Sequence, residues 1–337
     1  MDAARDPASE RLGGARMYKQ LIIAAAGGLV SAILSLGLLT GSSGALLFAY
    51  FAPLPLLLIG LSFGLISVSA AIFAALIVVV NLAGGAQAAI FAASIALPAW
   101  LITRYATAQR TLPGGAQAAY SPGDILARIA VGGGLLLLLG ALATSNTEGG
   151  LQGWVGIFIE RMLGAQLASG GAERTLFADR LTPLFPAITA LSWLVMVIIN
   201  AALAQSLLIR IGKTQRAAVR YAQTAIPEWF YWVFVAAAAV SLMASGSVEY
   251  LSRNLAIIFA APFLFVGLGV FHSLSRRVSA PGMALTAFYV FLILFSWAGV
   301  FVAGLGFLEP WARLRERFAK QQPPRTDTEE ERWKSYF

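Results

Sequence analysis

The chain is dominated by apolar runs that are long enough to cross a lipid bilayer as helices. About 20 apolar residues in a helix span the hydrocarbon core, where backbone polar groups must bond internally. We predict nine such segments, at residues 21–40, 44–59, 60–80, 86–103, 125–143, 183–209, 229–245, 254–272 and 283–304. The expected fold is therefore all-α, a polytopic transmembrane helical bundle of about eight or nine spans.

Local signals set two of these boundaries. Residues 44–80 are too long for one span, and Pro53, Pro55 and Gly60 interrupt them. We expect two helices there, the first of them short and tilted, kinked or partly re-entrant. Ser121-Pro122-Gly123-Asp124 is a turn and N-cap signal before the span at 125–143.

Composition supports a membrane body with polar ends. Of the 337 residues, 58% are apolar and 12% are charged, about half the charged share of a soluble domain, which excludes a soluble enzyme. We divide the chain into a cytoplasmic segment (1–20), a transmembrane domain (21–308), and an amphipathic helix with a disordered tail (309–337). The net charge of +8 indicates a lipid bilayer as partner and no nucleic acid.

The distribution of Lys and Arg predicts orientation. With the N-terminus inside and each segment through residue 272 crossing, 13 basic residues face the cytoplasm and four face the other side (Arg161, Arg174, Arg180 and Arg253). We therefore predict a cytoplasmic N-terminus. A final crossing at 283–304 would place the basic tail outside. A cytoplasmic tail requires a bend, for example at Trp297-Ala298-Gly299, or one earlier segment that does not span.

The largest loop, 145–182, is expected on the non-cytoplasmic side. Within it, Trp154, Phe158, Arg161, Met162 and Leu167 suggest an amphipathic helix at the interface. This helix would either cover the bundle or form a lid over a cavity.

Polar residues inside the spans are few. Asn81 lies near a predicted end, and Asn200 and Gln205 lie deeper. Each either bonds a neighbouring helix or lines a ligand pocket, so these three are the candidate ligand-binding residues. The chain has one His and no Cys. No zinc motif, nucleophile elbow or intramembrane Asp pair is present, so we predict no catalytic residue, no metal site, no cofactor and no enzymatic activity.

Small residues recur every fourth position on the first span. Ala24, Gly28 and Ala32 form one stripe, with a second stripe at Gly27, Ser31 and Ser35 beside it. Such stripes let helix backbones approach closely. They serve either packing within the chain or docking of a partner subunit.

Four stretches, in this order, resemble the YybS-like family of predicted bacterial integral membrane proteins, a domain of unknown function. They are 51–64 with Pro53 and Pro55; Pro186-Ala187 with Asn200 and Arg210; Asn254 leading to Gly267 and His272; and 306–315 with Glu309 and Trp311. Glu309 stands where relatives more usually carry Asp. The resemblance implies a multi-pass protein of the bacterial inner membrane.

The likeness extends, more distantly, to substrate-binding subunits of energy-coupling-factor transporters and to the rod-shape protein MreD. The former dock through a small-residue stripe on their first helix, similar in place to Ala24, Gly28 and Ala32. Two functions follow as expectations. One is a transport-associated or small-molecule-binding subunit that partners another membrane subunit or a cytoplasmic ATPase. The alternative is a structural scaffold of the cell envelope with a role like that of MreD.

Overall fold

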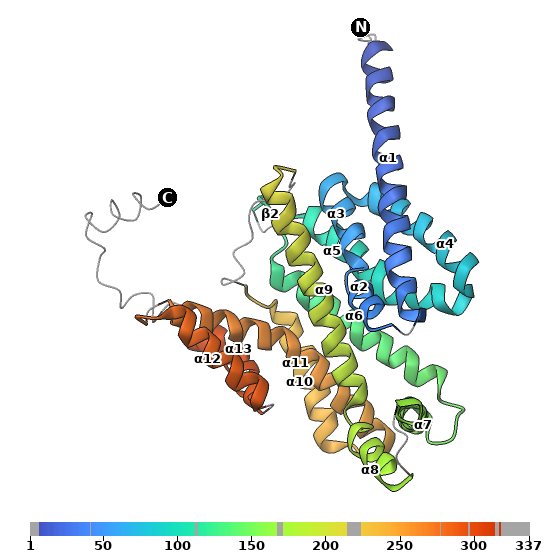
Figure 1. Cartoon of the computed structure of the whole chain (residues 1–337). Coiled ribbons are helices and arrows are strands. Elements are labelled where there is room, and N and C mark those ends of the chain that lie inside the picture. Colours follow the sequence, from blue (N-terminus) through green and yellow to red (C-terminus); the bar gives the residue numbers. More distant parts are fainter. Residues whose placement is uncertain are drawn as a thin grey trace. The chain divides into compact units, whose positions relative to one another are not determined.

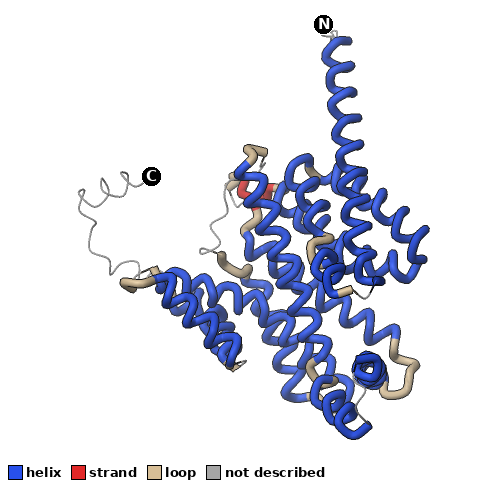
Figure 2. The backbone as a smooth tube through the Cα atoms, viewed as in Figure 1, coloured by secondary structure: helices blue, strands red, loops and turns tan. Residues whose placement is uncertain are grey.

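The computed structural model describes residues 7–40, 42–111, 114–166, 171–213, 224–276, 278–295, 297–313 and 317. Nearly all of them are helical (Figure 2). Among these residues, five helical segments are long and apolar enough to cross a membrane: Met17–Leu36, Leu65–Thr107, Pro122–Ala143, Phe185–Arg210 and Gly246–Ser275. A sixth is counted if α12 (Pro281–Leu294) and α13 (Ala298–Ala312) form one broken span.

The predicted number of eight or nine spans is not confirmed, and the difference comes from four places. Residues 44–59 form two short helices, α2 (Ser43–Ala49) and α3 (Pro53–Phe63). The segments 60–80 and 86–103 merge into one 43-residue run. Residues 229–245 correspond to α10 (Glu228–Met243), which has only 16 residues. The final segment is broken between α12 and α13 at the predicted bend.

The exposed surface is what a bilayer requires. Large apolar side chains such as Ile66 and Leu242 are 81% and 86% exposed. A soluble protein seldom exposes apolar patches on this scale, whereas lipid tails solvate them without cost. The helical composition and this surface together make the chain a membrane-embedded protein.

The chain divides into two compact units. The first contains residues 1–219 and 233–259, and the second contains residues 220–232 and 260–337. Helices α10 and α11 (Gly246–Ser275) contribute to both units.

In the first unit, α1 (Pro7–Leu36) packs against α4 (Leu65–Phe91) and α3 (Figure 1). Ala24 and Ala32 are fully buried, and a Cβ on Gly28 would overlap the carbonyl oxygen of Ala71 in α4. The Ala24, Gly28 and Ala32 stripe is therefore occupied by packing within the chain and is not open to another subunit.

The sequence had suggested a helix break at Gly60. In the structure the break lies at Gly64, after α3. Gly64 has φ +88° and ends the helix, a conformation that glycine adopts without strain. Gly60 stays inside α3, where a Cβ would overlap the hydroxyl of Thr103 in α5 (Leu97–Thr107). The two glycines thus have different roles, because Gly64 ends α3 and Gly60 allows close helix packing.

Helix α4 continues past Gly84, whose φ of +84° kinks it, into a π-helical turn (Ala92–Ala96) and α5 (Leu97–Thr107). Two short antiparallel strands follow, β1 (Gln109–Thr111) and β2 (Gln117–Ala119). The sequence did not predict this hairpin. It leads into α6 (Pro122–Ala143), where Ser121 and Asp124 form a reciprocal capping box, so the predicted N-cap is confirmed.

The loop at 145–182 contains two helices, α7 (Gly150–Gln166) and α8 (Gly171–Leu181). Val155 and Ile159 of α7 are buried with Ala178 of α8. Trp154 and Phe158, on the predicted amphipathic face, are largely exposed and stack at 5.6 Å between ring centroids. The exposed aromatic face suits the membrane interface, where aromatic rings accumulate. Leu167, also assigned to this face, lies outside the described residues.

In the second unit, α11 and α13 approach closely through glycine. A Cβ on Gly306 would overlap the carbonyl oxygen of Phe263, and one on Gly267 would overlap that of Val302. Phe263 and then Gly267 along α11 meet Gly306 and then Val302 on α13, so the two helices are antiparallel. The predicted boundary at 308/309 falls inside α13, which ends at Arg313 in a left-handed conformation (φ 46°). The expected amphipathic helix and tail beyond it lie almost entirely outside the described residues.

Candidate functional site

The strongest candidate site is the interruption between α2 and α3 at Tyr50-Phe51-Ala52. Pro53 and Pro55 carry no N–H group, so this stretch cannot form a regular helical ladder. Two side chains from distant helices bond its carbonyls. Asn200 of α9 (Phe185–Arg210) donates from Nδ2 to the carbonyl of Tyr50 at 2.9 Å. Ser31 of α1 donates to the carbonyl of Ala52 at 2.7 Å. We call this group the α2–α3 break.

Asn200 is the most informative residue at the α2–α3 break. Its side chain is fully buried, and Nδ2 also donates to the carbonyl of Met196 at 2.8 Å. Because only the NH₂ group can donate to two carbonyls, the orientation of the amide is fixed. Its Oδ1 atom is buried with no hydrogen-bond partner among the described residues. A buried acceptor without a donor costs about 1–3 kcal/mol, so this atom is available for a ligand that donates a hydrogen bond.

A second interruption uses the same face of α9. Pro98 cannot donate to the carbonyl of Ser94, four residues before it, and the chain forms a π-helical turn there. Trp193 donates from its indole N–H to this carbonyl at 2.7 Å. Trp193 and Asn200 are seven residues apart and share a helix face. One face of α9 therefore donates hydrogen bonds to backbone carbonyls at two helix interruptions, one at Tyr50 and one at Ser94.

The other two predicted ligand-binding residues lie elsewhere. Asn81 is exposed and donates to the carbonyl of Ile77 in its own helix at 2.7 Å. Within the described part of the chain, its one hydrogen bond stays inside its own helix. Gln205 is buried in α9, at 6% exposure. Asn200 bonds the α2–α3 break, through its hydrogen bond to the carbonyl of Tyr50.

Asn254, one of the residues that carry the family resemblance, has a structural role at the start of α9. Its Oδ1 accepts from the backbone N–H of Ala187 at 2.9 Å, and its Nδ2 donates to the carbonyls of Pro183 (3.1 Å) and Tyr250 (2.8 Å). The hydroxyl of Tyr250 donates to the carbonyl of Thr182 at 3.0 Å. Both the oxygen and the nitrogen of the Asn254 amide are thus hydrogen-bonded. Through these bonds α11 holds the first turn of α9 in place.

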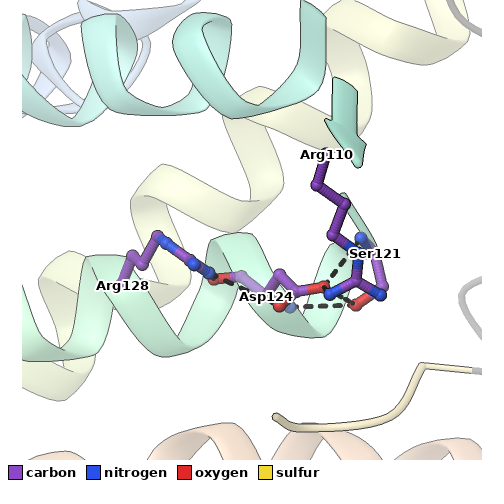
Figure 3. A network of polar contacts seen from close by, with 4 residues as sticks. All are labelled: Arg110, Ser121, Asp124 and Arg128. Carbon is purple, nitrogen blue, oxygen red and sulfur yellow. Dashed lines mark hydrogen bonds and ion pairs between the residues drawn. The ribbon is translucent and has the colours of Figure 1, made fainter. Parts of the chain in front are cut away.

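A charged cluster lies where α5, the hairpin and α6 meet (Figure 3). The carboxylate of Asp124 is buried and accepts from the backbone N–H and hydroxyl of Ser121 at 3.0 and 2.8 Å. Arg128 of α6 and Arg110 of β1 approach it from opposite sides at 3.5 and 3.7 Å. Arg128 also donates to the backbone carbonyl of Asp124 at 2.8 Å.

Two tyrosines complete this cluster. The guanidinium of Arg128 lies 4.6 Å from the ring centroid of Tyr105 and 5.1 Å from that of Tyr120. The guanidinium of Arg110 lies 6.0 Å from the ring of Tyr120. We refer to Tyr105, Arg110, Tyr120, Asp124 and Arg128 as the tyrosine–arginine cluster. No sequence motif marked it, because its members are spread over three elements.

The remaining resemblance residues fall in the second unit. The Nδ1 atom of His272 lies 3.0 Å from the carbonyl oxygen of Leu268 in its own helix, and it donates to that oxygen in the tautomer with the proton on Nδ1. Glu309 is buried, at 8% exposure. Trp311 contacts the ring of Tyr231, near the start of α10, at 5.4 Å between centroids. The end of α13 therefore lies beside the start of α10.

The described residues contain no group of three or more His, Asp or Glu side chains that could hold a metal ion. Buried polar side chains at interrupted helices and a lipid-compatible surface define a polytopic helical membrane protein. The chain belongs to the family described as "Predicted membrane protein (DUF2232)", whose profile matches residues 29–309. This match supports the YybS-like resemblance. No curated protein and no solved structure matches the chain.

Proposed function

We propose that the chain is a transport-associated membrane subunit that binds a small molecule at the α2–α3 break. The observation that carries the proposal is the buried Oδ1 atom of Asn200, which has no donor among the described residues. Interrupted helices with bonded backbone carbonyls are a recurring device of substrate sites in transporters. A ligand hydroxyl or amine would supply the missing donor.

Two features support this placement over a purely structural role. Interhelical bonds from Asn are worth about 0.6 kcal/mol on average in membranes, less than the cost of leaving one acceptor buried and unpaired. A residue needed only to join helices would gain more by pairing both ends of its amide, as Asn254 does at the start of α9. Asn200 pairs only its donor end.

The test is ligand-dependent stabilisation of the purified protein in detergent. A panel of vitamins, other small molecules with hydroxyl or amine groups, and metal ions is screened by thermal shift. We expect at least one compound to raise the melting temperature of the natural protein and to lose that effect in Asn200→Leu. Asn81→Leu is the matched control, because Asn81 bonds only its own helix. No shift across the panel, or equal shifts in both variants, would count against the proposal.

The location and partners of such a subunit are part of the same proposal. We place it in the bacterial inner membrane with a cytoplasmic N-terminus, on the basis of the asymmetry of 13 to four basic residues in the predicted loops. A further membrane subunit or a cytoplasmic ATPase would be its partner. Since Ala24, Gly28 and Ala32 are buried, docking would have to use another face. The alternative scaffold role relies on the basic segment after Trp311, and crosslinking in membranes would test it.

A further inference from the structure

We propose that the tyrosine–arginine cluster binds the phosphate group of an anionic phospholipid. This site is separate from the α2–α3 break and does not depend on the function proposed for it.

The charge balance is strongly positive. Asp124 is the only acidic residue between Glu10 and Glu148. Three arginines lie on the elements that meet there: Arg104 in the last turn of α5, Arg110 on β1 and Arg128 on α6. Two of these guanidinium groups, those of Arg110 and Arg128, face the one carboxylate. A cationic excess of this kind is favourable only near anionic groups or water.

Asp124 is already committed to other partners. Its Oδ2 atom accepts two hydrogen bonds from Ser121, and its Oδ1 atom lies 3.5 Å from Arg128. The shortest approach of Arg110 is 3.7 Å, which is longer than a hydrogen bond. The side chain of Arg110 is 44% exposed. Its planar fork is held near Tyr120, and its donors are available to bind an anion.

The depth of the cluster matches that of lipid headgroups. It lies between the end of one apolar run, at Thr107, and the start of the next, at Pro122. Tyr105 and Tyr120 pack edge to face with ring centroids 5.1 Å apart, and tyrosine is enriched at this level of membranes. A guanidinium binds phosphate oxygens with two parallel hydrogen bonds. Phospholipid phosphate is the anion present at this depth.

The test measures lipid binding to the purified full chain. Phosphatidylglycerol and phosphatidylcholine are titrated separately into detergent-solubilised protein, and thermal stabilisation gives an apparent affinity for each. We expect phosphatidylglycerol to bind more tightly. Loss of one basic contact near the surface, worth about 1 kcal/mol, should weaken its binding about fivefold in Arg110→Gln. Arg110→Lys should recover part of the loss, because it keeps the charge but not the fork.

Arg180→Gln is the matched control, since Arg180 is an exposed arginine in the last turn of α8. It should leave the affinity for phosphatidylglycerol unchanged. Inorganic phosphate forms a third arm. If millimolar phosphate stabilises the natural protein as well as the lipid does, and Arg110→Gln removes both effects, the site binds soluble phosphate and the lipid assignment is wrong. Equal affinities for the two lipids, or equal losses in the Arg110 and Arg180 variants, would overturn the proposal.

Discussion

Replacing Asn254 by Leu should destabilise the protein by about 2 kcal/mol. Two of its bonds join α11 to the entry of α9, at the backbone N–H of Ala187 and the carbonyl of Pro183. Each such bond is worth about 0.6 kcal/mol in a membrane protein. The N–H of Ala187 belongs to the first turn of α9, where helices have no internal acceptor, and Ala187 is buried. Leaving that group unpaired adds about 1 kcal/mol or more.

The assay is equilibrium unfolding in mixed micelles with a rising fraction of SDS, followed by circular dichroism. Asn81→Leu provides the control, because Asn81 is exposed and bonds only its own helix. A surface change of this kind should alter the unfolding free energy by no more than about 0.5 kcal/mol. If Asn254→Leu were as stable as the control, the bonds from Asn254 to α9 would contribute nothing and the reasoning would be refuted.

Three further outcomes are expected. Gly306→Leu should destabilise the second unit by about 3 kcal/mol or more, measured by the same unfolding assay, because the new side chain would overlap the backbone of α11; a neutral effect would contradict the close packing. Trp193→Phe should cost about 1 kcal/mol through the lost bond to the carbonyl of Ser94, whereas an unchanged midpoint would show that this bond contributes nothing. Because the natural chain has no cysteine, single cysteines at Glu228 and Arg313 can be labelled with an impermeant maleimide. Both should react from the same side of the membrane, because Trp311 at the end of α13 packs on Tyr231 at the start of α10, and labelling from opposite sides would contradict this packing.

Several features of the fold could be predicted from the sequence because they depend on local chemistry. Apolar length predicted the helices Met17–Leu36, Pro122–Ala143 and Phe185–Arg210 closely. The cap at Ser121 and Asp124 follows from side chains that bond their own neighbours. The break near Trp297 also followed from local residues. In each case the structure depends on residues that are close together in the sequence.

The features that could not be predicted depend on what a residue meets across the fold. Gly60 and Gly64 cannot be told apart in the sequence, where they form a spaced pair. In the fold, Gly60 contacts α5, whereas Gly64 has a positive φ and ends α3. Asn254 was singled out without its partner, because hydropathy contains no information about which helices are neighbours. For the same reason the sequence did not indicate the tyrosine–arginine cluster, whose members come from different elements. Among the polar candidates, burial separates Asn200 from Asn81, and burial is a property of the packed bundle.

The bonds at the start and in the interior of α9 also restrict how the protein can move. Asn254 bonds the first turn of α9, and Asn200, further along it, bonds the carbonyl of Tyr50 in the α2–α3 break. Sliding α9 along its axis by one turn, about 5.4 Å, would break both 2.9 Å bonds. Helix α9 is therefore held at two points in the first unit, and any rearrangement that moves α2 and α3 relative to it must break the bond between Asn200 and Tyr50.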